Sequence, residues 1–96
     1  ICTSTYGQGD VPDNALGVYE HLQDTRPDLS TVRYGLFAMG DSTYDATYCA
    51  GGKLFDSLLT ELGAVRIGDV EEHDASSGTM AEDAGAKWAL DWAQLV

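Results

Sequence analysis

Two short polar loops, each carrying a tyrosine among glycines and hydroxyl-bearing residues, are the stretches of this sequence best suited to chemistry. The first spans residues 4–10 and the second residues 40–45. Two tyrosines on opposite sides of a gap can hold a planar ring between them by offset stacking. The glycines allow close approach to the backbone, and the hydroxyls offer hydrogen bonds to the polar edge of such a ring. Either loop alone resembles an ordinary exposed turn, but their shared character favours a ligand site.

Strand-like apolar segments alternate with segments of helical periodicity, and these predict the elements that position the two loops. Strands are predicted at residues 1–5, 32–39 and 64–70, and helices at residues 15–25, 50–62 and from 79 onwards. Alternation with short connections indicates an α/β fold with a parallel sheet and right-handed crossovers. Loops that follow parallel strands emerge at the same sheet edge, so Tyr6 and Tyr44 are expected to project into one crevice.

The helices carry more detailed predictions. Asp13 or Asn14 is expected to cap the first helix, and Thr79 with Glu82 to form a capping box for the last. The middle helix has an apolar stripe made by Leu54, Phe55, Leu58, Leu59 and Leu62. Its opposite side is expected to face water and carries Lys53, Asp56, Thr60 and Glu61. Residues 71–78 are predicted to form a polar loop. Its acidic run, which includes His73, is interpreted as a solvated loop rather than a metal site.

Composition limits the possible partners. The chain has 96 residues, enough for one domain, and a net charge of −11 from sixteen acids and five bases. Such a charge argues against nucleic acid and against anionic membrane surfaces, and favours a basic protein partner, although solubility alone is the simpler interpretation. No apolar run is long enough to cross a bilayer. Cys2 and Cys49 have no metal-binding spacing and fit a reducing cytoplasm.

The two loops and the segments around them resemble a known family, the flavodoxin-like FMN-binding domains. The third-strand loop of that family is matched by Ser4-Thr5-Tyr6-Gly7-Gln8-Gly9-Asp10 and then Pro12-Asp13-Asn14-Ala15. Its fourth-strand loop is matched by Gly40-Asp41-Ser42-Thr43-Tyr44, then Tyr48-Cys49 and Lys53-Leu54. The pattern covers essentially the whole chain and is most similar to the short MioC-type flavodoxins. The FMN domains of sulfite reductase flavoprotein and cytochrome P450 reductase come next.

The resemblance implies a flavodoxin-like three-layer α/β/α fold with a parallel sheet, and FMN as cofactor. It assigns Tyr44 to one face of the isoalloxazine ring and Tyr6 to the other. It also implies that the ring or the ribityl chain is contacted by Ser4, Thr5 and Gly7. The pyrimidine end of the ring would be contacted by Met39, Gly40, Asp41 and Thr43, and the pocket would be closed by Tyr48, Cys49 and Asp74.

The chain also departs from the family pattern. A complete flavodoxin domain has two earlier strands with their helices, and a phosphate-binding loop after its first strand. Residues 1–96 would therefore form a partial domain that supplies only the last three strands and helices. Residues 1–5 would then be an open sheet edge.

The implied function is electron transfer rather than substrate turnover, with one or two electrons passing between a reductase and an acceptor that docks through a basic face. The carboxylates of Asp10, Asp41 and Asp45 are expected to disfavour a negatively charged reduced flavin and so lower its potential. Three alternatives remain open at this point: the FMN domain of a diflavin reductase, a flavin-free α/β interaction module, and a chain that is inactive alone.

Overall fold

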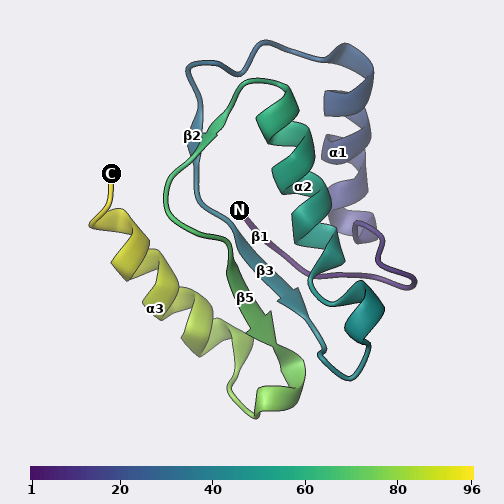
Figure 1. The fold of residues 1–96 in the computed structure, drawn as a ribbon, viewed down its shortest axis with the longest axis vertical. Helices are drawn as coiled ribbons and strands as arrows, with labels where there is room; N and C mark the ends of the chain where they lie inside the picture. Colours follow the sequence, from purple (N-terminus) through teal and green to yellow (C-terminus); the bar gives the residue numbers. More distant parts are fainter.

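A parallel sheet of three strands, in the order β1-β3-β5, forms the centre of the molecule. The computed structural model describes the backbone of residues 1–96 and every side chain except that of Asp45. Along the chain lie β1 (Cys2–Thr3), α1 (Asp13–Thr25), β2 (Arg33–Tyr34), β3 (Phe37–Gly40), α2 (Ala50–Glu61), β4 (Val65–Arg66), β5 (Glu71–Asp74) and α3 (Ala81–Ala93). Short 3-10 turns span Asp45–Thr47 and Ala75–Ser77 (Figure 1).

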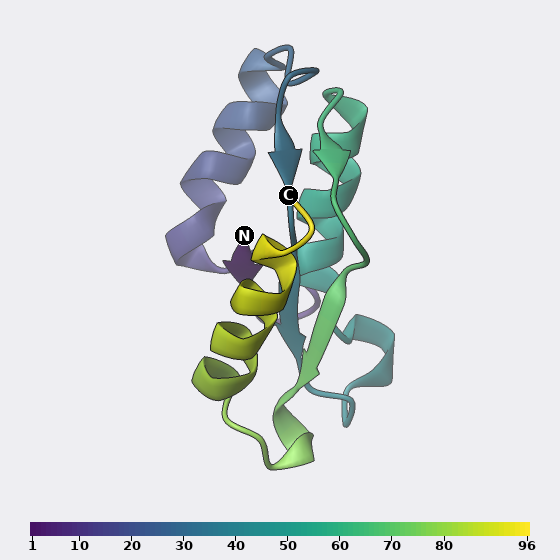
Figure 2. The same ribbon diagram turned by 90° about the vertical axis from the view of Figure 1, so that its left-hand side faces the viewer.

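The helices cover both faces of the sheet, as two neighbouring residues of β3 demonstrate. A Cβ added at Gly52 of α2 would meet Ala38, whereas one added at Gly85 of α3 would meet the ring of Phe37. Because successive strand residues point to opposite faces, α2 and α3 lie on opposite sides of the sheet. Helix α1 packs beside α2, and Figure 1 shows α3 alone on the other side of β3 and β5; in Figure 2 this side faces the viewer and α3 (yellow) lies in front. The predicted three-layer α/β/α arrangement with parallel strands is therefore confirmed.

The strand predicted at residues 32–39 is divided in two. Gly35 and Leu36 interrupt it, and Gly35 lies against Trp92, where an added Cβ would be 2.3 Å from the indole nitrogen. The first half, β2, pairs with β4 in a separate parallel ribbon, and only the second half, β3, joins the central sheet. The strand predicted at residues 64–70 is correspondingly wrong in extent, since only Val65–Arg66 is paired there.

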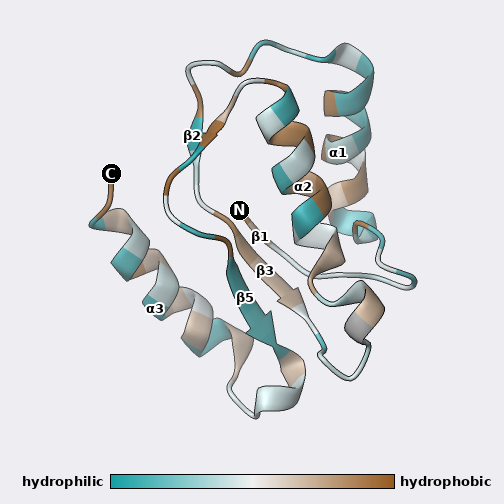
Figure 3. Ribbon diagram, in the orientation of Figure 1, coloured by the Kyte–Doolittle hydropathy of each residue, from teal (hydrophilic) through white to brown (hydrophobic). Residues whose placement is uncertain are grey.

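The edge strand β5 occupies residues that we predicted to be a polar loop. Glu71–Asp74 pairs in parallel with Phe37–Gly40 in register, and the Glu71 amide donates to the Leu36 carbonyl at 2.9 Å. Of its side chains only His73 is buried, stacked on Phe37 with ring centroids 5.8 Å apart. Figure 3 shows the resulting contrast between hydrophilic β5 and the more apolar β3. Backbone pairing, rather than an apolar side-chain pattern, defines this edge strand.

Both predicted helix caps are wrong. Helix α1 begins at Asp13 itself, after Pro12 in an extended conformation, and no side chain caps it. Proline suits this position because its φ is preset and its missing N–H needs no partner. Helix α3 begins at Ala81 after Met80, again without a side-chain cap, so Thr79 and Glu82 form no capping box.

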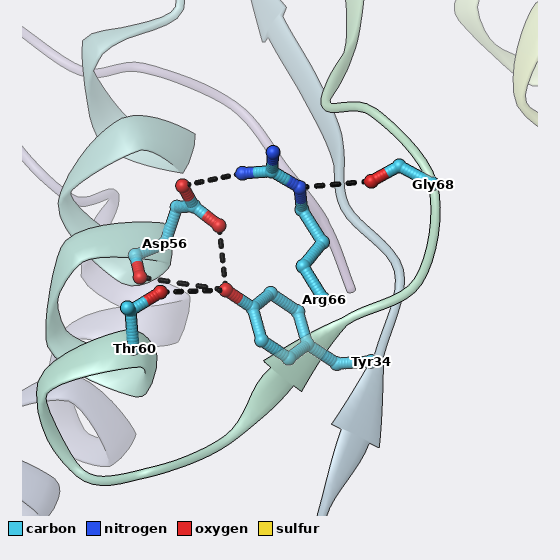
Figure 4. A network of polar contacts seen from close by, with 5 residues as sticks. All are labelled: Tyr34, Asp56, Thr60, Arg66 and Gly68. Atoms are coloured by element: carbon cyan, nitrogen blue, oxygen red, sulfur yellow. Dashed lines mark hydrogen bonds and ion pairs between the residues drawn. The ribbon is translucent and has the colours of Figure 1, made fainter.

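The apolar stripe of α2 forms the core with the sheet. Phe55, Leu58, Leu59 and Leu62 are buried, and Leu59 belongs to one cluster with Leu36, whereas Leu54 is 38% exposed. Asp56, expected to face water, is instead half-buried and pairs with Arg66 and Tyr34 (Figure 4). Strand β1 lies at the sheet edge as predicted, with Ile1 and Cys2 exposed. Among the described helices, none combines the length and apolarity that a bilayer crossing requires.

Candidate functional site

A cleft of about 390 Å³ opens at the carboxyl ends of β1 and β3, where both tyrosine-bearing loops emerge. From the first loop it is lined by Ser4, Thr5 and Gly7, and from the second region by Met39, Gly40, Asp41, Tyr44 and Thr47, with Ala75 closing one side. The volume falls within the range typical of small-molecule sites. Parallel pairing of β1 with β3 brings the two loops together, since Thr3 pairs with Ala38 just before the two loops begin.

The two tyrosines occupy different positions relative to this cleft. Tyr44 lines it and is 68% exposed, so its ring is available to a ligand. Tyr6 is 59% exposed but lines a second cleft, of about 350 Å³, together with Tyr19 and Asp13. The turn from Tyr6 to Asp10 closes on itself, with the Asp10 amide donating to the Tyr6 carbonyl at 2.7 Å. The structure thus separates the two rings that the sequence was expected to bring into one crevice.

The second loop is held by two carboxylates. Asp41 accepts a hydrogen bond from the Thr43 amide at 2.9 Å, and Asp74 accepts one from the Ser42 amide at 3.0 Å. Asp74 also accepts from the amide and hydroxyl of Ser76, at 3.0 and 2.8 Å. Hydrogen bonding from Ser42, and then from Ser76, holds the pKa of Asp74 well below its usual range. Asp74 and Thr43 therefore support the loop and do not line the cleft.

Cys49 and Tyr48 lie behind the cleft. The Cys49 side chain is fully buried, with its Sγ 3.5 Å from the Ala38 carbonyl, and burial raises the pKa of the thiol. Burial, followed by the proximity of Cys49, raises the pKa of Tyr48 to about 12. Gly40 is required here, because a Cβ at this position would lie 2.4 Å from the Cys49 amide nitrogen. These residues back the second loop rather than face a ligand.

Two lining residues were missed by the sequence interpretation. Thr47 donates to the Tyr44 carbonyl at 3.3 Å, and its place in the polar stretch after Tyr44 was an available signal. Ala75 has no chemical signal of its own. It reaches the cleft only because β5 lies beside β3, a pairing that the sequence did not predict.

The cleft has an acidic environment. Its lining includes the carboxylate of Asp41 and no lysine or arginine, while Asp10 is exposed in the first loop. The ion pairs among the described side chains, Arg26–Glu61, Lys53–Glu72 and Arg66–Asp56, do not involve lining residues. The side chain of Asp45 lies outside the described part of the structure, so its expected contribution stays a prediction. No cluster of metal-ligating side chains occurs among the described residues.

Comparison with known proteins shows which sequences and structures this chain is similar to. Residues 1–88 match the sequence profile described as flavodoxin. Flavodoxin YqcA of Pectobacterium carotovorum is 44% identical over all 96 residues, and the chain spans 63% of that relative's length. NADPH–cytochrome P450 reductase of Bos taurus is 46% identical over 83 residues, which are 86% of this chain and 12% of the reductase. The C101A mutant of flavodoxin from Pseudomonas aeruginosa superimposes with a TM-score of 0.84 at 33% identity, covering 98% of this chain and 63% of that one.

Proposed function

Since this chain belongs to the flavodoxin family, we propose that its cleft holds the isoalloxazine ring of FMN and that the protein is an electron carrier. One or two electrons would pass between a reductase and an acceptor protein. The observation that carries the proposal is the single cleft built from both loops, with the exposed ring of Tyr44 in its wall.

The residues of the cleft fit a flavin ring. Tyr44 offers an uncovered aromatic face, which is the partner that a planar heterocycle prefers. Gly7 and Gly40 line the cleft without side chains, so a ring can reach the backbone there. The absence of basic residues from the lining suits an uncharged ring and not the phosphate group.

Phosphate binding is assigned in this proposal to a part of the protein outside residues 1–96. Helix N-termini are the usual phosphate sites. Here the first turns of α1 and α3 carry acidic residues, Asp13 in the one and Glu82 and Asp83 in the other. The Gly51 amide in the first turn of α2 already donates to Thr5. The chain spans 63% of the length of each of the two flavodoxins named above, and β1 would become an inner strand of a complete sheet.

The bound FMN would supply the redox chemistry, and the side chains of this chain would place it and tune its potential. Tyr44 would act as the ring platform, whereas Tyr6 lies in the neighbouring cleft with Tyr19. Asp41 would disfavour additional negative charge in the cleft, as would the carboxylate of Asp74 farther back. Their field also favours a redox partner that approaches through a basic face, in the cytoplasm.

A second candidate is the FMN domain of a two-flavin reductase, favoured by the 46% identity to the bovine P450 reductase. NADPH added to the full-length protein separates the two functions. A reductase would reduce its own FMN with NADPH as the only electron donor, whereas a stand-alone carrier would need a separate reductase.

The proposal is tested by titrating FMN into the full-length protein and following quenching of flavin fluorescence. Tyr44→Ala should weaken binding by about 1–3 kcal/mol if stacking resembles that of bases on aromatic side chains. Tyr44→Phe is the matched control, because it keeps the ring and loses only the hydroxyl. Absence of quenching in the wild-type protein would reject flavin binding, and equal affinity of Tyr44→Ala and wild type would reject Tyr44 as the platform.

The assignment of β1 to an inner strand has its own test. The Cys2 thiol is exposed in the structure of residues 1–96, where no strand covers it. In the full-length native protein it should be protected from alkylation, like the buried Cys49. Rapid alkylation of Cys2 in that protein would show that β1 remains a sheet edge.

A further inference from the structure

The Thr5 hydroxyl joins three segments at the wall of the cleft, which Thr5 lines. It donates to the Met39 carbonyl at the end of β3, at 3.0 Å, and accepts from the Gly51 amide in the first turn of α2, also at 3.0 Å. These partners are 34 and 46 residues away along the chain. Thr5 itself precedes Tyr6, so one oxygen atom connects the first loop, the start of the second loop and α2.

The hydrogen-bonding capacity of this hydroxyl is largely used. A threonine hydroxyl has one donor hydrogen and two acceptor lone pairs. The hydrogen points to Met39, and one lone pair receives the Gly51 amide. The oxygen therefore has no hydrogen left for a flavin acceptor atom. Towards a ligand this hydroxyl can act only as an acceptor, through its remaining lone pair, and its two bonds point to a positioning role.

Helix α2 needs this bond because its own sequence provides no cap. The residue before its first turn is Cys49, whose side chain makes no capping hydrogen bond. The first amides of a helix lack partners within the helix, and an unsatisfied buried amide is costly. Gly51 is buried, and a Cβ there would lie 2.4 Å from the Ser4 carbonyl oxygen. Glycine thus lets the helix approach β1 closely enough for Thr5 to satisfy its amide.

The first loop has few other attachments. The paired residues of β1 end at Thr3, and the hydrogen bonds of the turn from Tyr6 to Asp10 are internal to that turn. Among the described side chains, Thr5 provides the hydrogen bonds that tie residues 4–10 to the rest of the molecule. Without them, the spacing between the two loops would depend on packing alone.

We propose that Thr5 is a positioning residue: it caps α2 from the loop that follows β1 and so holds the two ligand loops at a set separation before the cofactor binds. The inference rests on the proposed function for its ligand, but the tie itself is a property of the protein without FMN. A preformed cleft binds more tightly because less ordering is required on binding.

The test uses the full-length protein with Thr5→Val, which keeps the shape and loses the hydroxyl, and Thr5→Ser, which keeps the hydroxyl. Thr25→Val is the matched control, because it removes an exposed hydroxyl that donates to the His21 carbonyl on α1. Hydrogen exchange of the Gly51 amide is measured by NMR in the FMN-free protein. FMN and riboflavin affinities are measured by fluorescence.

Thr5→Val should accelerate hydrogen exchange of the Gly51 amide. It should also weaken the binding of FMN and of riboflavin by about the same factor, about five- to tenfold, the usual consequence of one lost hydrogen bond. Thr5→Ser should restore both properties, and Thr25→Val should change neither. Thr5→Ala replaces Thr5→Val if the valine variant does not fold.

Unchanged Gly51 exchange in Thr5→Val would overturn the proposal. Weakened flavin binding with unchanged exchange would instead identify Thr5 as a direct ligand contact. If the wild-type protein binds neither flavin, the proposed function fails, and the Gly51 exchange alone then decides whether Thr5 ties the loops.

Discussion

The ion pair between Asp56 and Arg66 should stabilise this fold far more than the pair between Arg26 and Glu61. The two have nearly the same length, 2.7 and 2.8 Å. They differ in exposure, since the side chains of Asp56 and Arg66 are 23% and 32% exposed, whereas those of Arg26 and Glu61 are 52% and 66% exposed. Replacing Asp56 with Asn and Glu61 with Gln removes one charge from each pair with little change in shape.

The magnitude follows from the partners of each carboxylate. Asp56 accepts from Arg66 and also from the Tyr34 hydroxyl, at 2.5 Å, while the Arg66 Nε donates to the Gly68 carbonyl (Figure 4). Charge-assisted bonds contribute about 1.5–3 kcal/mol against about 1 kcal/mol for neutral ones, so losing the charge from two of them costs about 2 kcal/mol after allowance for partial exposure. Exposed pairs contribute about 0–1 kcal/mol, so Glu61→Gln should cost less than about 0.5 kcal/mol.

The measurement is urea unfolding of the full-length protein, followed by the fluorescence of its tryptophans. With a urea dependence of about 1–3 kcal/mol per molar, Asp56→Asn should lower the midpoint by about 1 M and Glu61→Gln by much less. Burial is the main cause that raises the pKa of Tyr34, and its bond to Asp56 is the second. The pKa of Tyr34 should therefore fall only partway toward its usual value in Asp56→Asn. Equal midpoint shifts in the two variants would refute the argument from burial.

Three further predictions concern the cleft and the groups around it. Asp41→Asn should raise the midpoint potential of bound FMN by about 40 mV, because it removes about 1 kcal/mol of repulsion between nearby solvated charges. The potential is measured by potentiometric titration, with Asp24→Asn on α1 as the control. An unchanged potential in Asp41→Asn would exclude Asp41 as a group that lowers the flavin potential. Since the pKa of Asp74 is lowered in the fold, its stabilisation is complete above the unfolded value of 3.8 and declines as pH falls below it. In thermal denaturation, Asp74→Asn should therefore lose less stability than the wild type as the pH falls below this value. The same dependence of stability on pH in the two proteins would contradict the prediction. Tyr48, with its pKa raised from 10.0 to about 12, should be among the last tyrosines to ionise in a spectrophotometric titration, and the fold should lose stability as pH rises from 10.0 toward that value. Loss of this late phase in Tyr48→Phe would assign it, whereas its persistence would mean that another tyrosine is responsible.

Local patterns predicted the helices and the two loops well. The apolar stripe of α2 repeats at helical spacing, and the residues that end α1 and α2 lie close to the predicted positions. A helix satisfies its hydrogen bonds within a few residues, so its signal is carried by the neighbouring sequence. The loop motifs were equally visible, because glycines, hydroxyls and a tyrosine are concentrated in short segments.

Long-range pairing decided the features that the sequence did not predict. Strand β5 has mostly exposed polar side chains, and it is a strand because its backbone pairs with β3 more than thirty residues earlier. The same pairing brings Ala75 and Asp74 to the second loop, and the close approach of α2 to the first loop lets the Thr5 hydroxyl accept from the Gly51 amide.

The amino-acid sequence alone therefore specified the family, the helices, the order of the layers and the two loops that carry the ligand chemistry. Tertiary structure alone decided which members of those loops line the cleft and which support it from behind. The physical reason is that backbone pairing and hydroxyl–amide bonds between distant segments depend on which segments lie side by side in the fold. The side-chain pattern of either segment alone does not specify that arrangement.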